Sequence, residues 1–144
     1  MEKNIILNQD QIKHITKRIA YQIYETFSNE TEIVIAGIAN SGFVFSQKIA
    51  KVLEEISDLR VVICEVQVNK QNPNEPIVTS ISETEYANKC IVLVDDVMNS
   101  GATLIYGVRH FLNVPIKQFK TPVLVDSNHK NFSVKADLKL ISFS

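Results

Sequence analysis

The hydrophobic positions along the chain follow two spacings, one typical of helices and one typical of buried strands. Apolar residues recur every three or four positions between residues 12 and 27 and again between residues 44 and 56, which predicts two amphipathic helices. Asn8 and Gln11 have the spacing of a capping box, so we expect the first helix to begin near Asn8. A third helix is expected at residues 102–112.

Short apolar runs lie between these helical segments and predict buried strands. They cover residues 32–37, 60–68, 89–94, 119–125 and 136–143. Strands that alternate with single helices form β-α-β units, whose strands run parallel. We therefore expect a three-layer α/β fold with a mostly parallel central sheet. Residues 38–42 predict a tight loop, and residues 69–82, which contain two of the four prolines, predict a longer one.

Length and composition set the class of protein. A chain of 144 residues suits a single domain that spans residues 1–144, and 45% apolar residues suffice for a core. The net charge of −1 gives no overall attraction to nucleic acid or to an anionic membrane. Because no apolar run approaches the ~20 residues of a membrane span and no secretion signal begins the chain, we expect a cytoplasmic protein. Cys64 and Cys90 lie in apolar runs and are expected to be reduced and buried.

The predicted strand at residues 89–94 ends in two adjacent acids, which are the first candidate site residues. Asp95 and Asp96 follow the strand directly, at the edge of the sheet where open α/β folds bind ligands. Ionised carboxylates are hydrogen-bond acceptors only. The pair therefore suits the two hydroxyls of a cis-diol, or a hydrated Mg²⁺ ion.

A loop of small polar residues follows and begins the third helix. Its residues are Asn99, Ser100, Gly101, Ala102 and Thr103. Free amides and the helix dipole favour an anion at such a position, Gly101 allows close approach of the backbone, and the hydroxyls add donors. Diol acceptors followed by a phosphate loop predict a ribose 5-phosphate site. A simpler alternative stays open, in which the acids begin a turn and Ser100 caps the helix.

Residues 91–104 closely resemble the phosphoribosyl-pyrophosphate motif of the type I phosphoribosyltransferases. That motif consists of an apolar strand, two acids, two apolar residues, a variable residue and Thr/Ser-Gly-x-Thr. The resemblance extends to the family of bifunctional pyrimidine-operon attenuators and uracil phosphoribosyltransferases. Its further matches are Ile6-Leu7, Arg18-Ile19-Ala20, residues 37–42, residues 123–130 and Ala136-Asp137.

This resemblance implies a role for each candidate. Asp95 and Asp96 would hold the ribose hydroxyls, and residues 99–103 would wrap the 5-phosphate. The pyrophosphate loop would consist of Ala39, Asn40, Ser41 and Gly42, and residues 69–82 would form a lid. The implied reaction uses Mg²⁺ and 5-phosphoribosyl-1-pyrophosphate, and a base nitrogen displaces pyrophosphate from C1 of the ribose. Uracil or another pyrimidine is the expected base.

Four positions depart from the family pattern. Asn40 and Ser41 stand in the pyrophosphate loop where a Lys or Arg is usual, and Ala102 stands where Arg or Lys is frequent. Asn99 replaces an Asp of the purine-specific members, which argues against a purine substrate. Family members also continue well beyond the Ala136-Asp137 match, whereas this sequence ends at Ser144.

Several other residues allow two interpretations. Asp126 follows a predicted strand and would either recognise the base or cap a turn. Phe143 would either stack on a base or pack in the core, and the core is favoured. His110 is expected to interact with the helix dipole rather than to catalyse. A basic face would bind RNA in the family, although a solvated surface is the favoured interpretation; its residues are His14, Lys17, Arg18, His129 and Lys130.

Three functions therefore compete at this stage. The favoured one is a phosphoribosyltransferase that acts on a nucleobase. The second is a nucleotide-sensing, RNA-binding regulator of pyrimidine genes with weak or no catalysis. The third is a flavodoxin-like domain whose acid pair binds Mg²⁺, which leaves the Ser-Gly-x-Thr loop unexplained. The family resemblance also implies a homo-oligomer, with a dimer expected.

Overall fold

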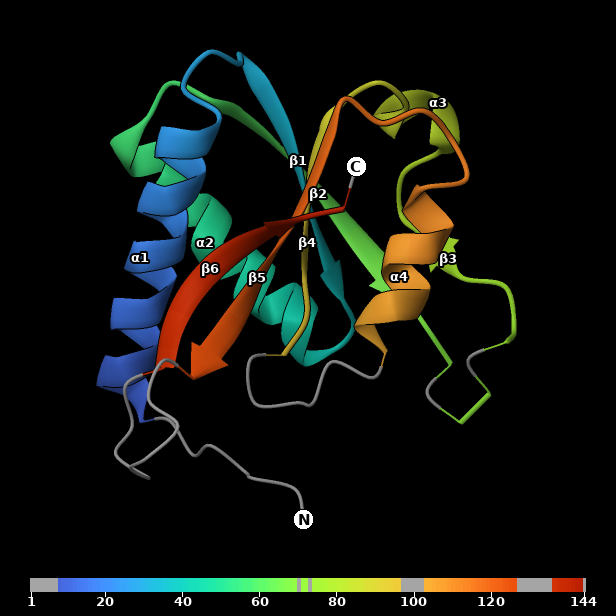
Figure 1. Cartoon of the computed structure of the whole chain (residues 1–144), viewed down its shortest axis with the longest axis horizontal. Helices are drawn as coiled ribbons and strands as arrows, with labels where there is room; N and C mark the ends of the chain where they lie inside the picture. Colours follow the sequence, from blue (N-terminus) through green and yellow to red (C-terminus); the bar gives the residue numbers. More distant parts are fainter. Residues whose placement is uncertain (1–7, 70, 73, 97–102, 127–135, 144) are drawn as a thin grey trace.

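A six-stranded sheet forms the middle layer of the protein. The computed structural model describes residues 8–69, 71–72, 74–96, 103–126 and 136–143. The strands are β1 (Glu32–Ile38), β2 (Arg60–Gln67), β3 (Val78–Thr79), β4 (Cys90–Val94), β5 (Gln118–Asp126) and β6 (Ala136–Ser142). The helices are α1 (Gln9–Thr26), α2 (Ser41–Ile56), α3 (Glu83–Tyr86) and α4 (Leu104–Phe111). Figure 1 shows α1 and α2 on one face of the sheet and α3 and α4 on the other, which confirms the predicted three layers.

The strand order is β3-β2-β1-β4-β5-β6. The four central strands run parallel, and both edge strands run antiparallel to their neighbours. The prediction of a mostly parallel sheet is therefore correct. The connections β1-α2-β2 and β4-α4-β5 are the two parallel crossovers that the alternation of strands and helices predicted.

Two short elements differ from the predictions. The segment predicted as a loop at residues 69–82 contains β3, which pairs with the end of β2. The one-turn helix α3 follows, with a capping box between Ser82 and Glu85. Both are too short for a periodic pattern to reveal. The capping box predicted at Asn8 is confirmed, since its side-chain oxygen accepts from the amide of Gln11 at 2.8 Å.

Both faces of β1 and β4 are buried, as their unbroken apolar runs predict. Along β1, Ile33 and Ile35 face the core under α1 and α2, whereas Val34 and Ala36 face the core under α3 and α4. Phe143 packs against the core under α3 and α4, with its ring edge-on to that of Phe119 and the two ring centres 6.2 Å apart. The core interpretation of Phe143 is thus supported.

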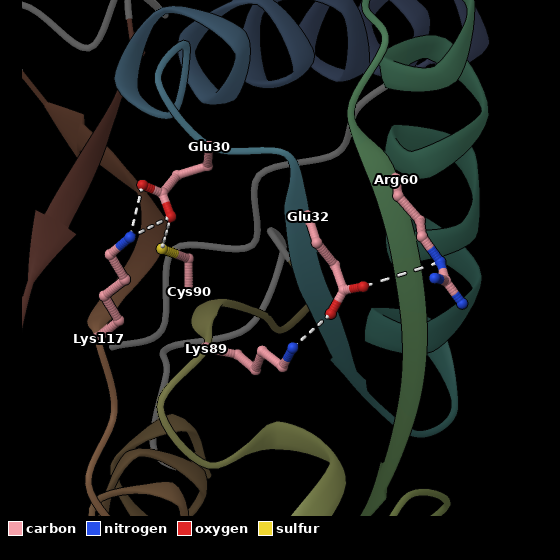
Figure 2. A network of polar contacts seen from close by, with 6 residues as sticks. All are labelled: Glu30, Glu32, Arg60, Lys89, Cys90 and Lys117. Carbon is pink, nitrogen blue, oxygen red and sulfur yellow. Dashed lines mark hydrogen bonds and ion pairs between the residues drawn. The ribbon is translucent and has the colours of Figure 1, made fainter.

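At the edge of the sheet where the parallel strands begin, charged side chains pair with one another (Figure 2). Lys117, before β5, donates to both carboxylate oxygens of Glu30, before β1, at 2.7 and 2.9 Å. The Cys90 thiol at the start of β4 donates to the same carboxylate at 3.4 Å. Glu32 pairs with Lys89 at 3.0 Å and lies 3.8 Å from the Arg60 guanidinium. We call this edge of the sheet, where the parallel strands begin, the amino edge.

Both cysteines are free and buried, as predicted. Burial raises the pKa of the Cys64 thiol. Burial, together with the hydrogen bond to Glu30, raises the pKa of Cys90 to about 11. Neither thiol is therefore a nucleophile at neutral pH. Among the described helices, none is long and apolar enough to cross a membrane.

Candidate functional site

The candidate site lies at the opposite edge, where β1 and β4 end side by side. We call this the carboxyl edge. The two strands are parallel neighbours, and Gly37 is in register with Val94. The residues that follow each strand therefore leave the sheet at the same place. These residues are the predicted pyrophosphate loop, residues 39–42, after β1 and the acid pair after β4.

Gly42 brings the first turn of α2 against the acid pair. A Cβ atom at this position would lie 2.8 Å from the carbonyl oxygen of Val94 and 3.0 Å from the Cα of Asp95. The first distance is shorter than real Cβ contacts and the second is tighter than most of them, and both atoms belong to the backbone. Only glycine permits this approach. The helix also begins earlier than its apolar spacing indicated, at Ser41 rather than near residue 44.

The N-terminus of α2 lies at this edge. Asn40 occupies the N-cap position, but its side chain makes no capping hydrogen bond. The amides of the first helical turn, residues 41–43, have no intrahelical acceptor. Residues 39–42 contain no Lys or Arg. The attraction for an anion here comes from the amides and from the dipole of a 16-residue helix.

Asp95 points toward the start of α4. One of its carboxylate oxygens accepts a hydrogen bond from the Thr103 hydroxyl at 3.0 Å, and the other accepts from the Asp96 amide at 2.8 Å. Both acids are half-buried, at the margin between core and solvent. Each carboxylate oxygen has a second lone pair for a ligand hydroxyl. Asp95 therefore keeps acceptor capacity for a ligand at this edge.

Thr103 is the one described member of the predicted 5-phosphate loop. It occupies the N-cap position of α4, where its side chain makes no capping bond and its hydroxyl donates to Asp95. Asn99, Ser100, Gly101 and Ala102 lie outside the described residues, so their roles stay predictions.

Comparison with known proteins decides the family. A profile of the phosphoribosyl transferase domain matches residues 3–142 of this chain. The chain belongs to this family. Its membership confirms the resemblance drawn from residues 91–104 and decides against the flavodoxin-like alternative.

The relatives of this chain are distant, but their similarity extends over nearly the whole chain. The bifunctional protein PyrR of Clostridium novyi is 29% identical over 94% of this chain and 80% of its own length. The bifunctional protein PyrR of Bacillus subtilis is 25% identical over 94% of this chain and 81% of its own length. A hypoxanthine phosphoribosyltransferase of Trypanosoma cruzi superposes with a TM-score of 0.69 at 17% identity, over 92% of this chain and 78% of that one. A hypoxanthine-guanine phosphoribosyltransferase of Bacillus anthracis superposes with a TM-score of 0.65 at 22% identity, over 95% of this chain and 79% of that one. These structures establish the type I fold.

The described residues fit a metal ion that arrives with its substrate. Among them, no group of three or more His, Cys, Asp or Glu side chains could hold a metal. Two carboxylates remain, Asp95 and Asp96, and Mg²⁺ is usually bound by one or two carboxylates together with substrate phosphates. Asp126 ends β5, a parallel neighbour of β4, so its backbone lies at the same edge. Its side chain lies outside the described residues.

The segment predicted as a lid contacts α4. Residues 74–77 line a pocket of about 310 Å³ together with Tyr106, Arg109, His110 and Asn113, and neither acid lines it. Burial lowers the pKa of His110. Burial thus disfavours the charged imidazole on which the expected interaction with the helix dipole depends. His110 instead packs edge-on to Phe111 at 5.6 Å.

The predicted basic face is described only in part. His14 and Lys17 are exposed on α1, and Arg18 is half-buried with a polar partner. His129 and Lys130 lie outside the described residues. The sequence pattern also missed two contacts that organise the site, Gly42 against Asp95 and Thr103 with Asp95. The glycine at residue 42 was the available signal for the first contact, and no signal pointed to the second.

Proposed function

We propose that this protein binds 5-phosphoribosyl-1-pyrophosphate with Mg²⁺ and transfers the phosphoribosyl group to a nucleobase. The observation that carries the proposal is that the N-termini of α2 and α4 both meet Asp95, one through Gly42 and the other through Thr103. Phosphoribosyl-pyrophosphate has phosphates at two ends of a ribose and two vicinal hydroxyls between them. Two anion-binding helix ends with carboxylates between them match that arrangement.

Each part of the carboxyl edge has a role in the proposal. Asp95 and Asp96 accept hydrogen bonds from the ribose hydroxyls, residues 99–103 bind the 5-phosphate, and residues 39–42 bind the pyrophosphate. A bond forms between a base nitrogen and C1 while the bond from C1 to pyrophosphate oxygen breaks. The carboxylates favour the positive charge that develops on the ribose. Mg²⁺, when bound, neutralises the pyrophosphate as it leaves.

Uracil or another pyrimidine is the proposed base. Asn99 supports this choice, because an amide cannot accept a proton usefully at neutral pH, whereas the Asp of purine-specific members can. Asp126 is the candidate for base contact, since β5 ends at the same edge as β4. The similar solved structures include hypoxanthine and hypoxanthine-guanine enzymes. The base is therefore best tested with pyrimidines and purines side by side.

The test measures binding and turnover on the same preparation. Phosphoribosyl-pyrophosphate with Mg²⁺ is expected to raise the melting temperature, because a ligand that binds only the native state stabilises it. Pyrophosphate release is then measured with uracil, cytosine, hypoxanthine and guanine, and uracil is expected to give the fastest rate. A thermal shift without turnover on any base would reject the enzyme but keep the binding site. No shift at all would reject both.

A second candidate is a nucleotide-sensing regulator that binds RNA, with weak or no catalysis. The absence of a cation from residues 39–42 favours it, because pyrophosphate would be held less firmly than in a fully active enzyme. The name of its relatives, bifunctional protein PyrR, is consistent with two activities in one chain. RNA affinity that falls steeply with salt and changes with nucleotide would support this candidate.

Light scattering of the same samples tests the expected homodimer.

A further inference from the structure

The pocket between α4 and the segment that leads into β3 is lined by neither acid of the carboxyl edge. Its volume of about 310 Å³ lies at the small end of the range of small-molecule sites, roughly 300–1,000 Å³. Residues 74–77 form one wall, beside α4 (Figure 1). The other wall consists of Tyr106, Arg109, His110 and Asn113, whose spacing places them on one face of α4 and of the turn that ends it.

Four polar side chains of the pocket form no hydrogen bond or ion pair with any described residue. They are the guanidinium of Arg109, the amides of Asn74 and Asn113 and the hydroxyl of Tyr106. A ligand can therefore bind all four without breaking a contact within the described part of the protein. A guanidinium presents a planar set of donors that matches a phosphate group, and a carboxamide presents a donor and an acceptor side by side.

Among the described residues that line the pocket, Glu75 is the one acid, and it does not pair with Arg109. Its carboxylate oxygens accept from the side-chain amides of Asn69 at 2.8 Å and Asn72 at 3.4 Å, and each oxygen keeps a lone pair for a further donor. A free phosphate ion is attracted by the guanidinium and repelled by the carboxylate. A longer ligand, with an anion at one end and hydrogen-bond donors at the other, satisfies both groups.

Two rings, those of Tyr106 and His110, give the pocket flat surface one turn apart on α4. Burial lowers the pKa of His110, which favours the neutral imidazole. Nucleobases stack on aromatic side chains, and their edges form paired hydrogen bonds with asparagine. Base amino groups and ribose hydroxyls are donors of the kind that the Glu75 carboxylate accepts.

We propose that this pocket is a nucleotide site, separate from the carboxyl edge, that binds a nucleoside monophosphate. The phosphate pairs with Arg109, the base lies against Tyr106 and bonds to the two amides, and the ribose or the base donates to Glu75. Binding here does not depend on the proposed transfer, because the pocket shares no lining residue with the carboxyl edge. Since residues 74–77 belong to the segment predicted as a lid, a bound nucleotide joins that segment to α4.

A simpler role for Arg109, as a cation that satisfies the end of α4, fits the structure less well. The carbonyls of the last turn already accept from backbone amides. These hydrogen bonds run from Leu112 to Val108 at 3.1 Å, from Asn113 to His110 at 3.3 Å and from Val114 to Phe111 at 3.4 Å. The end of a helix carries about half a negative charge, which is less than the full positive charge of a guanidinium. Arg109 thus remains available to an anion.

The test follows the backbone amides of the full chain by NMR during titration with UMP, and with uridine and inorganic phosphate as its two fragments. We expect shifts at residues 74–77 and 106–113, and a UMP affinity at least about tenfold above that of either fragment, because only UMP reaches both ends of the pocket. If the proposed function holds, UMP also shifts amides near Asp95. The variant Asp95→Asn with Asp96→Asn is expected to lose those shifts and to keep the shifts at the pocket.

Three variants locate the contacts. Arg109→Met removes the cation and keeps the aliphatic stem, and UMP should bind the pocket roughly tenfold more weakly or worse. Asn113→Leu is expected to weaken UMP several-fold and to leave phosphate unchanged. Lys17→Met is the matched control, since it removes one exposed positive charge from α1 on the opposite face of the sheet. Its UMP affinity should stay within about twofold of the wild type, because distant exposed charges are screened.

The position of the shifts decides the matter. The inference is overturned by the absence of shifts at residues 74–77 and 106–113, or by pocket shifts that Arg109→Met leaves unchanged. Phosphate that binds as tightly as UMP overturns the nucleotide assignment. Failure of the proposed function gives a different pattern, since wild-type protein then shows the pocket shifts without those near Asp95. Amide spectra of the variants show whether the fold is retained.

Discussion

The two edges of the sheet use their charged groups in opposite ways. At the amino edge, carboxylates and ammonium groups are paired with one another, as Glu30 is with Lys117 and Glu32 with Lys89. At the carboxyl edge, Asp95 accepts from a hydroxyl and an amide, neither of which carries a charge. The first arrangement satisfies its charges within the protein. The second leaves negative charge and helix amides for a ligand, so mutations at the two edges should change different properties.

The largest effect is expected from the double substitution Asp95→Asn with Asp96→Asn. Each ribose hydroxyl would lose its hydrogen bond to a charged acceptor, and such a bond contributes about 1.5–3 kcal/mol. We therefore expect the affinity for phosphoribosyl-pyrophosphate to fall by roughly a hundredfold or more. Isothermal titration calorimetry with Mg²⁺ present measures the change.

The amino edge supplies the matched control for this variant. Glu30→Gln with Glu32→Gln removes the same number of negative charges, but at the opposite edge of the sheet. Its ligand affinity should stay within about twofold of the wild type, since exposed charges farther apart than the Debye length of ~8 Å are screened. Equal losses of affinity in the two double variants would show that net charge, rather than the diol contact, is responsible.

The next effect comes from Gly42→Ala, which tests the contact between α2 and the acid pair. The added methyl would press on backbone atoms of Val94 and Asp95, so the first turn of α2 must move. Overpacking of this kind costs about 1–3 kcal/mol of unfolding free energy. Urea denaturation measures that loss, and calorimetry is expected to show weaker binding of phosphoribosyl-pyrophosphate as well.

Gly107→Ala is the comparison for that variant. A Cβ atom at Gly107 would lie 2.9 Å from the end of the Leu93 side chain, which can move, and alanine favours the helix by about 1 kcal/mol. The two effects oppose each other, so we expect little net change. A loss at residue 107 as large as that at residue 42 would mean that any added methyl is harmful, and the special role of the carboxyl edge would not hold.

The same contrast explains how much the sequence could predict. Unbroken apolar runs located β1 and β4, and the acids after β4 with the loop that follows located a ribose 5-phosphate site. Local patterns of this kind are visible in a single chain. The contact between Gly42 and Asp95 joins segments more than fifty residues apart and depends on strand order, which no local pattern contains. The Thr103–Asp95 hydrogen bond depends on a side-chain orientation, which is equally absent from the sequence.

A smaller effect is expected from Tyr86→Phe, close to the amino edge. Tyr86 is fully buried, and its hydroxyl has no hydrogen-bond partner among the described residues. Burial also raises the pKa of this phenol. Because an unsatisfied buried hydroxyl costs about 1–3 kcal/mol, its removal should increase the unfolding free energy by about 1 kcal/mol.

Tyr106→Phe, at a half-buried pocket position, is the control and should change the unfolding free energy by less than about 0.5 kcal/mol. A destabilised Tyr86→Phe would reveal a partner for the hydroxyl.

The smallest effect is expected from Lys117→Met, and it should depend on pH. The hydrogen bond from Lys117 lowers the pKa of Glu30, and the same contact raises the pKa of Lys117. A lowered carboxyl pKa stabilises the folded protein above the unfolded value of 4.5, and this stabilisation disappears as the pH falls through the folded value. A raised ammonium pKa stabilises it below the unfolded value of 10.5. The stability difference between wild type and variant should therefore be present between these limits and shrink as the pH falls below 4.5. Melting curves measured from pH 3 to pH 8 test this expectation. A stability difference that persists undiminished at pH 3 would mean that Lys117 acts by packing. Ligand affinity that is unchanged in the variant would show that the amino edge contributes to stability and not to ligand binding.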